Sequence, residues 1–307
     1  MTARPGRVDF KWAEGVHISI RRLHIHSNGR VTGHIVVRSE APNPVGLLHR
    51  GDLNLSATRS KKELAKALLE ALALWDWGLA VEMVCDRTLN ILEEGDPVER
   101  VLVDPEEELP PPAYALHPLM PLGMPTIIYG DGGSAKSILG IGFGLTCLLP
   151  WEANPFDLIP PPKSMCPLYL DWEMDLPTFK YRLQLYLKGH SLPAVEMPYR
   201  RCYLPLAQDL EHIQNIVADT GADLLIVDSL GAATGGDLNQ SEGPLAFFAA
   251  LRQLNVTALV IAHTSKDREG DRGVYGNVHF RNYARSVWEC RKQQEVDADD
   301  LYIALLH

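Results

Sequence analysis

The sequence lacks the features that would indicate an oxidising compartment, secretion or a bilayer. Its five cysteines are scattered over 307 residues without a C-x-x-C pair, so neither a disulfide framework nor a cysteine zinc site is indicated. No apolar run of the kind that a secretory signal needs follows residues 1–7. The most apolar stretch, residues 138–149, is too short to span a bilayer. We therefore expect a cytoplasmic protein with no membrane partner.

An excess of positive charge is also missing. The chain has 29 Lys and Arg against 39 Asp and Glu, a net charge of -10, so any contact with nucleic acid must come from a local patch or loop. No Asn-Lys-x-Asp motif follows the later strands, which argues against a guanine-specific GTPase. No G-x-G-x-x-G opens a helix, which argues against a dinucleotide site. The hydrophobic content of 46% is ordinary for a globular protein with a buried core.

Residues 1–104 are predicted to form a small α+β accessory domain. Asn28-Gly29, between two alternating runs in residues 23–37, predicts a hairpin with a two-residue turn. Ser60 and Glu63 have the spacing of a capping box and predict the start of a helix that Gly78 ends.

Three histidines of this hairpin, His24, His26 and His34, lie near one another and raise the alternative of a metal site. Histidines on a half-exposed sheet usually have no chemical role. No carboxylate or cysteine joins these three at ligand spacing, so we favour the interpretation without a metal.

An acidic, proline-rich linker is predicted at residues 105–114, and beyond it the pattern changes. Short apolar runs alternate with helical segments through residues 115–307. Strands are expected at 126–129, 168–171, 223–228, 257–263, 286–290 and 301–306, and helices at 137–149, 176–189, 210–217 and 243–254. Such alternation predicts an α/β domain with a mostly parallel sheet covered by helices on both faces.

A phosphate-binding loop follows the first of these strands and opens the first helix. Its residues are Gly130, Asp131, Gly132, Gly133, Ser134, Ala135, Lys136 and Ser137. Backbone N–H groups of such a loop converge on phosphate, Lys136 reaches the β- and γ-phosphates, and the hydroxyl of Ser137 coordinates Mg²⁺. ATP and Mg²⁺ are the ligands expected. Ala135 replaces the usual glycine before the lysine, which puts the turnover rate in question more than nucleotide binding.

Polar residues end three later strands of the predicted sheet. Glu173 follows the second strand and is placed to activate the attacking water. Asp171 and Asp175 are its rivals, although Asp175 is also a natural N-cap for the next helix. Asp228 ends four apolar residues, the Walker B pattern of an acid that holds the Mg²⁺ shell. His263 ends the next strand, where it would lie near the γ-phosphate unless it is simply a satisfied core histidine.

Together these segments resemble the RepA-like hexameric helicase branch of the RecA-fold P-loop ATPases, a superfamily that includes RecA, DnaB and KaiC. The resemblance is carried by residues 130–137, 170–173, 226–229, 262–266 and 276–291. It implies a RecA-like core, self-assembly into a ring of six with ATP at the subunit interfaces, and catalytic roles for Lys136, Glu173, His263 and Arg285. Asp228 and Ser137 would be the metal residues.

The resemblance also implies a role for basic residues near the end of the chain. Arg285 falls at the position of an arginine finger that acts on a neighbour's site, with Arg281 and Arg291 as alternatives and a surface salt bridge as the competing interpretation. A loop at residues 264–281 would face the pore. Its candidate contacts to single-stranded DNA are Lys266, Arg268, Arg272 and Arg281. Acidic residues alternate with them, so a merely solvated loop is the alternative.

Three functions fit this pattern. The first is a ring-forming, DNA-dependent ATPase, most concretely a replicative-type helicase of a plasmid, phage or mobile element. The second is a RecA-type recombinase or recombination mediator, with slower hydrolysis. The third is a nucleotide-dependent regulatory or assembly protein that binds no DNA.

Overall fold

The computed structural model describes most of the chain, and it divides the chain into two compact units. The described residues are 1–4, 7–40, 46–73, 75–94, 102, 104–106, 108–238, 240–264, 274, 279–293 and 302–307. Unit 1 spans Met1–Glu108 and unit 2 spans Leu109–His307. The boundary falls within the acidic, proline-rich segment. Each unit is described by itself below.

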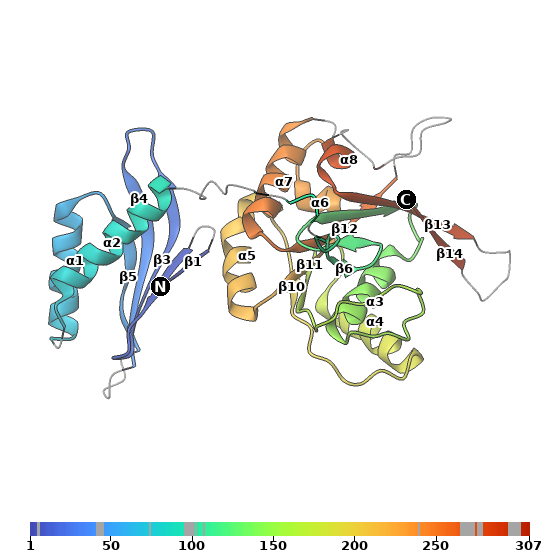
Figure 1. The fold of residues 1–307 in the computed structure, drawn as a ribbon, viewed down its shortest axis with the longest axis horizontal. Coiled ribbons are helices and arrows are strands. Elements are labelled where there is room, and N and C mark those ends of the chain that lie inside the picture. Colours follow the sequence, from blue (N-terminus) through green and yellow to red (C-terminus); the bar gives the residue numbers. More distant parts are fainter. Residues whose placement is uncertain are drawn as a thin grey trace. The chain divides into compact units, whose positions relative to one another are not determined.

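Unit 1 is a five-stranded antiparallel sheet with two helices on one face (Figure 1). The strands pair in sequence order: β1 (Thr2–Arg4), β2 (Arg7–Lys11), β3 (Val16–Ile25), β4 (Val31–Ser39) and β5 (Leu47–Asn54). The helices are α1 (Thr58–Ala71) and α2 (Trp77–Glu94). Alternate strand residues such as Ile18, Ile20 and Ile35 pack with Leu68 and Trp77 in one core. The opposite face of the sheet carries the other set of side chains.

The loop of the β3–β4 hairpin differs from the sequence-based expectation. A backbone hydrogen bond from His26 N–H to Arg30 C=O at 2.8 Å closes the hairpin, so its loop has three residues and not two. Only Gly29 has a positive φ there, +77°, whereas the predicted two-residue turn needs two such residues. Asn28 instead uses its side-chain oxygen to accept a hydrogen bond from the N–H of Arg30.

The two helices of unit 1 begin and end at other residues than expected. Helix α1 starts at Thr58, and Ser60 lies inside it. The carboxylate of Glu63 accepts a hydrogen bond from Arg59 at 2.8 Å and does not complete a capping box. The helix ends at Ala71, and Asp76 accepts the N–H of Leu79 in the first turn of α2. Gly78 therefore lies within the start of α2 and terminates nothing.

Unit 2 has a seven-stranded sheet in the order β10-β9-β11-β12-β8-β13-β14. Its strands are β8 (Pro125–Gly130), β9 (Pro167–Asp171), β10 (Tyr199–Arg201), β11 (Leu224–Asp228), β12 (Thr257–His263), β13 (Ser286–Gln293) and β14 (Tyr302–Leu306). All pair in parallel except β14, which runs antiparallel to β13. The predicted α/β class with a mostly parallel sheet is confirmed. A separate short pair is formed by β6 (Tyr114–Leu116) and β7 (Met120–Pro121).

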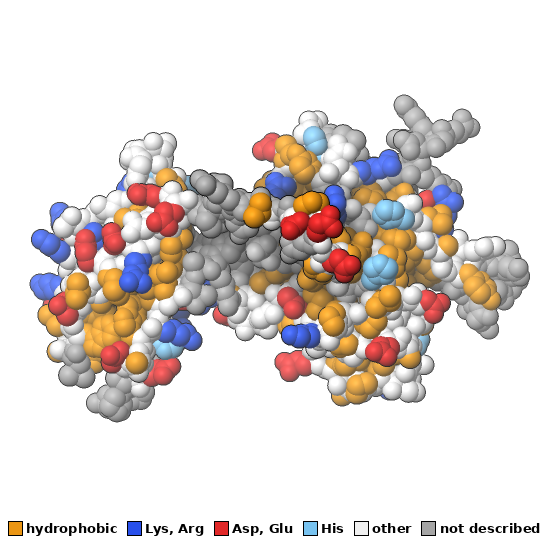
Figure 2. All heavy atoms as spheres, in the orientation of Figure 1, with side chains coloured by type: hydrophobic (Ala, Val, Ile, Leu, Met, Phe, Trp, Pro, Cys, Tyr) orange, Lys and Arg blue, Asp and Glu red, His pale blue; other side chains and the backbone are white. Residues whose placement is uncertain are grey.

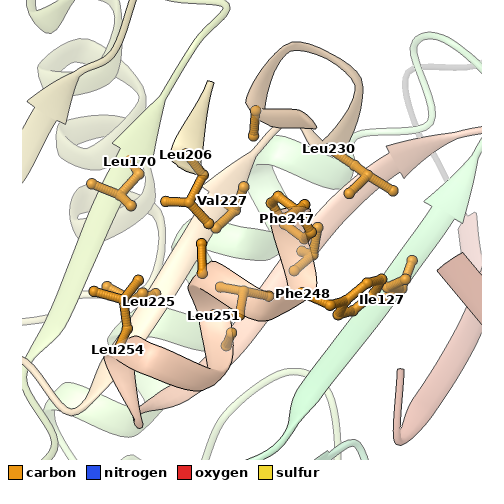
Figure 3. Packing of buried hydrophobic residues seen from close by; sticks show 14 of the residues in the cluster. Ile127, Leu170, Leu206, Leu225, Val227, Leu230, Phe247, Phe248, Leu251 and Leu254 are labelled. Atoms are coloured by element: carbon orange, nitrogen blue, oxygen red, sulfur yellow. The ribbon is translucent and has the colours of Figure 1, made fainter. Parts of the chain in front are cut away.

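Helices cover both faces of this sheet. They are α3 (Lys136–Leu148), α4 (Leu176–Gly189), α5 (Leu206–Thr220), α6 (Leu230–Thr234), α7 (Glu242–Leu254) and α8 (His279–Tyr283). Residues of α3 and α4 form one core with β6 and β7, and residues of α5, α6, α7 and α8 form another on the opposite face. Figure 3 shows Phe247, Phe248 and Leu251 of α7 pointing at Val227 and Ile127 of the sheet. The strands are thus buried on both faces, as their apolar runs predict.

Helix α3, which follows the phosphate loop, is the most buried helix of unit 2. Gly140 and Gly144 contact β12 and β11, where an added Cβ would lie 2.9 Å from Ile261 and 2.7 Å from Ile226. At Gly142 an added Cβ would lie 2.5 Å from the hydroxyl of Tyr186 on α4. These glycines weaken helix propensity but let the helix backbone approach the sheet closely.

Among the described residues, no helix is both long and apolar enough to cross a bilayer.

Candidate functional site

The carboxyl ends of four parallel strands bring the predicted site residues together. His263 of β12 pairs directly with Gly130 of β8, and Asp228 of β11 pairs with Asp171 of β9. This edge is where ligands bind in open α/β sheets. A cavity of about 300 Å³ opens there, and its lining comes from the phosphate loop, α3, α4 and three strand ends. The lining residues are Gly133, Ser134, Ala135, Lys136, Ser137, Ile138, Glu173, Arg182, Asp228, Ile261 and His263.

The loop between β8 and α3 has the backbone of an anion cradle. Gly133 has a φ of +72° and Ala135 a φ of +57°, so the chain makes two left-handed steps before the helix. A Cβ on Gly130 would collide with the backbone carbonyl of Cys290 on β13, which is why glycine is needed at that position. The first N–H groups of α3, from Lys136 on, have no acceptor within the helix and are available to phosphate.

Lys136 is folded into this loop. Its side chain is 6% exposed, and Nζ donates to the carbonyl oxygens of Gly130 and Asp131, both at 2.8 Å, and to Ser134 Oγ at 3.2 Å. Burial lowers the pKa of Lys136, while the neighbouring acidic groups, Asp228 and Glu173 among them, act against that shift. The ammonium group is therefore held by neutral carbonyls in a partly dehydrated place. An incoming phosphate would supply the negative charge that those carbonyls lack.

Asp228 is the most deeply buried acid of the cavity, with 1% of its surface exposed. Its Oδ2 accepts a hydrogen bond from the hydroxyl of Tyr169 at 2.6 Å, and Oδ1 makes no hydrogen bond of normal length. Burial raises the pKa of Asp228, and the hydroxyls of Tyr169 and Ser137 partly oppose that rise. A buried carboxylate oxygen without a donor, beside a serine hydroxyl, fits the hard-oxygen ligand set of Mg²⁺.

Glu173 lies across the cavity from the phosphate loop and stays accessible. Its side chain is 41% exposed, and its Oε1 accepts a hydrogen bond from Ser229 Oγ. The ring Nε2 of His263 lies 3.4 Å from the same oxygen. His263 is itself 51% exposed, so it is not a satisfied core histidine. A carboxylate held by a hydroxyl and an imidazole at the open side of the cavity is placed to accept a proton from water.

The two rivals of Glu173 have structural partners. Asp171 is fully buried, and its Oδ1 accepts the N–H groups of Glu173 and Met174 at 2.8 and 2.7 Å. Asp175 accepts the N–H of Thr178 at 2.9 Å and is the N-cap of α4. These bonds shape the turn that presents Glu173.

The candidate arginines Arg281, Arg285 and Arg291 are not among the residues that line this cavity. Arg285 and Arg281 are exposed. The N–H of Arg285 donates to Pro125 C=O at the amino end of β8, so Arg285 lies at the opposite edge of the sheet from its own phosphate loop. Arg291 donates to Glu289 at 2.7 Å within the same strand. The other pore-loop candidates, Lys266, Arg268 and Arg272, lie outside the described residues.

The structure adds residues that the sequence patterns do not single out. Arg182 of α4 lines the cavity, and Lys292 of β13 lies beside the loop, with its Nζ 3.8 Å from the place of a Cβ on Gly133. Tyr169, a strand residue of apolar appearance, holds Asp228. A helical arginine nine residues after Glu173 was a signal available in the sequence, whereas the position of Lys292 depends on the pairing of β13 with β8.

The three histidines of unit 1 do not gather around a common point. His34 bonds to Asp52 at 2.9 Å, and His26 bonds to Thr32 at 2.9 Å. The ring of His24 meets that of His26 edge to face. Across the described part of the chain, no three His, Cys, Asp or Glu side chains are placed to hold a metal ion.

Comparison with known families identifies a domain that contains the cavity. The model of the AAA domain family matches residues 94–269, more than half of the chain. The chain belongs to this AAA-domain family. The match includes the phosphate loop, Glu173, Asp228 and His263, and it excludes Arg285 and the sheet of unit 1. All of the residues that line the cavity lie within the matched range.

A more distant likeness is found among solved structures. A KaiC-like protein from the hyperthermophilic archaeon Pyrococcus horikoshii is 15% identical and has a TM-score of 0.42. The likeness covers 62% of this chain and 82% of that one. No curated protein matches the sequence.

Proposed function

We propose that this AAA-domain protein hydrolyses ATP as a self-assembled ring and uses the energy to move along single-stranded DNA, as a replicative-type helicase of a plasmid, phage or mobile element does. The observation that carries the ATPase part is the single cavity that joins the phosphate loop, a buried acid without a full set of donors, and an accessible carboxylate. The motor part rests on the resemblance of the motif set to RepA-like helicases.

Each residue of the cavity has a role in this proposal. The N–H groups at the start of α3 and the ammonium of Lys136 hold the β- and γ-phosphates. Ser137 and Asp228 would hold Mg²⁺, which would supply positive charge against the phosphate oxygens. Glu173 takes the proton of the attacking water, and Ser229 fixes the carboxylate for that task. His263, on the same carboxylate, transmits the state of the γ-phosphate to the loop that follows β12.

Assembly of several copies explains the placement of Arg285. An exposed arginine at the far edge of the sheet cannot reach the phosphate of its own chain, but it is free to meet the site of a neighbour. A finger of that kind is worth about 10³-fold or more in rate. We further propose that residues 1–104 form an accessory domain, joined by the linker at 105–114 to the ATPase domain at 115–307.

The test is the rate of ATP hydrolysis with and without single-stranded DNA, together with unwinding of a labelled fork. Stimulation with unwinding supports the helicase. Stimulation with strand exchange would select the recombinase or mediator, and no response to DNA would select the regulatory protein. Lys136→Ala is the control: it should abolish hydrolysis while the circular dichroism spectrum is unchanged. Normal hydrolysis by this variant would refute the site itself.

A further inference from the structure

The hairpin of β3 and β4 has an unusual charge composition for a chain of net charge -10. Residues 16–39 contain four Arg, four His and no Asp or Glu. They also contain no Phe, Tyr or Trp. A segment of this kind attracts anions, and it offers none of the large aromatic rings on which proteins usually stack unpaired bases.

Strand alternation places the basic side chains of this hairpin away from the core. Val16, Ile18, Ile20, Ile35 and Val37 pack on the helices of unit 1. The residues between them form cross-strand pairs on the other face, where His17 lies opposite Arg38 and Arg21 opposite His34. Among the described residues of unit 1, no helix packs on that face, since α1 and α2 pack against the core side. The open face is therefore the basic one.

Neighbouring strands add both signs of charge to this face. Lys11 lies opposite His17, and Arg50 lies opposite Val36. Acidic residues accompany the inner part of the face: Asp9 pairs with Arg7 at 2.7 Å, and Asp52 with His34 at 2.9 Å. On the helical side of unit 1, acidic and basic side chains are intermixed over α1 and α2 as well, as Figure 2 shows.

The outer part of the hairpin extends past β2, because the last register pair between them is at Arg21. On the other side the chain after β5 still accompanies β4, where the N–H of Leu55 donates to Val31 C=O at 2.9 Å. His24 and Ile25 pair with Thr32 and Val31 and form the end of a two-stranded ribbon (Figure 1). A bulge at Arg22, with φ +57°, increases the twist of the ribbon. Arg22, His24 and Arg30 are exposed there, and the side chain of Ile25 is 59% exposed at the end of β3.

We propose that the β3–β4 hairpin binds double-stranded DNA, with Arg22 and Arg30 on the phosphate backbone and the ribbon in the major groove. That groove of B-form DNA admits a two-stranded β-ribbon, whereas the major groove of duplex RNA is deep and narrow. The lack of Phe, Tyr and Trp favours a duplex over a single strand. This site is separate from the nucleotide cavity and gives unit 1 a task of its own.

The experiment measures binding of the full-length protein to a short labelled DNA duplex by fluorescence anisotropy, without nucleotide or Mg²⁺ and over a series of salt concentrations. Arg22→Ala/Arg30→Ala should weaken binding about tenfold and reduce the slope of log K against log salt by about two. Lys62→Ala/Lys66→Ala on α1 removes the same charge from exposed helix positions and should change neither. Arg22→Lys/Arg30→Lys should retain most of the affinity, which separates loss of charge from loss of folding.

Several outcomes would overturn the proposal. Equal weakening by the α1 control would show that only net charge matters, and equal affinity for polyglutamate would show nonspecific polyanion binding. Tighter binding of a single strand, or of duplex RNA, would refute the duplex DNA ligand. The result is independent of the ATPase proposal because Lys136→Ala should bind the duplex as the natural sequence does.

Discussion

The two sheets of this protein use their faces differently. The parallel sheet of unit 2 is covered by helices on both faces, and the polar side chains that line its cavity lie at or just beyond strand ends and on the adjoining loop and helices. The antiparallel sheet of unit 1 is covered on one face, and the other carries alternate polar side chains. Substitutions at a strand end of unit 2 should therefore alter catalysis, and substitutions within its layers should alter stability. Those on the open face of unit 1 should alter neither.

The largest effect that this comparison predicts is at Glu173. Glu173→Gln keeps the shape of the side chain but removes the proton acceptor, so kcat should fall about 10²-fold or more while ATP binding is retained. Steady-state hydrolysis and titration with a fluorescent ATP analogue measure the two quantities. Glu152→Gln, an exposed acid just after α3, is the matched control. A kcat unchanged in Glu173→Gln would remove this residue from the mechanism.

A layer position of unit 2 should show the opposite behaviour. Gly142→Ala forces a methyl group against Tyr186 and Phe156, and overpacking of this kind destabilises by about 1–3 kcal/mol. Urea denaturation should show the loss, and the catalytic rate of the folded fraction should be little changed. Gly29→Ala in the hairpin loop is the comparison variant. A methyl group there meets open space, so the only structural cost of this substitution is the positive φ of residue 29. If Gly142→Ala is as stable as the natural protein, α3 is not packed as described.

Replacement of Asp228 tests whether this buried acid at a strand end lowers the stability of the folded protein. Its pKa is raised by burial, so the folded protein binds this proton more tightly than the unfolded chain does. The stability that this protonated carboxyl contributes is present at low pH and is lost as the pH rises through its folded pKa. In the absence of Mg²⁺, Asp228→Asn should raise the Tm at neutral pH by a few degrees. The variant should also lose the decrease in stability that the natural protein shows as the pH rises through the folded pKa of Asp228. A lower Tm in the variant would contradict the assignment of burial as the cause.

The smallest effect is expected at Ala135. Its φ of +57° is left-handed, a conformation that costs a residue with a Cβ about 1 kcal/mol relative to glycine. Ala135→Gly relieves that cost but makes the unfolded chain more flexible, so the free energy of unfolding should change by less than about 1 kcal/mol. ATP affinity and kcat should rise modestly because the loop closes more easily around phosphate. A decrease in both would show that the methyl group supports the loop.

Much of unit 2 could be predicted from the sequence because buried parallel strands are continuous apolar runs. The run ending at Asp228 and the one ending at His263 were both located in this way, and Asp175 could be recognised as a helix cap. The short elements β6, β7, β10, α6 and α8 were not predicted, since two to five residues carry no periodicity. Site residues that depend on pairing between distant segments, such as Lys292 beside Gly133, also could not be predicted.

The structure of unit 1 was harder to predict from the sequence because its local patterns are compatible with more than one turn or helix start. Asn28-Gly29 permits a two-residue turn, but a three-residue loop with only Gly29 in the left-handed region satisfies the same strands. Glu63 could complete a capping box or pair with Arg59, and the ion pair prevails. The roles that depend on other molecules, those of Arg285 and of the hairpin, stay predictions.

The most direct test of the central claim is a crystal structure with Mg²⁺ and a non-hydrolysable ATP analogue. We expect the γ-phosphate at Lys136 Nζ, the metal between Ser137 and Asp228, and a water molecule between Glu173 and the γ-phosphorus. A triphosphate bound elsewhere, with Lys136 still on the carbonyls of Gly130 and Asp131, would contradict the account.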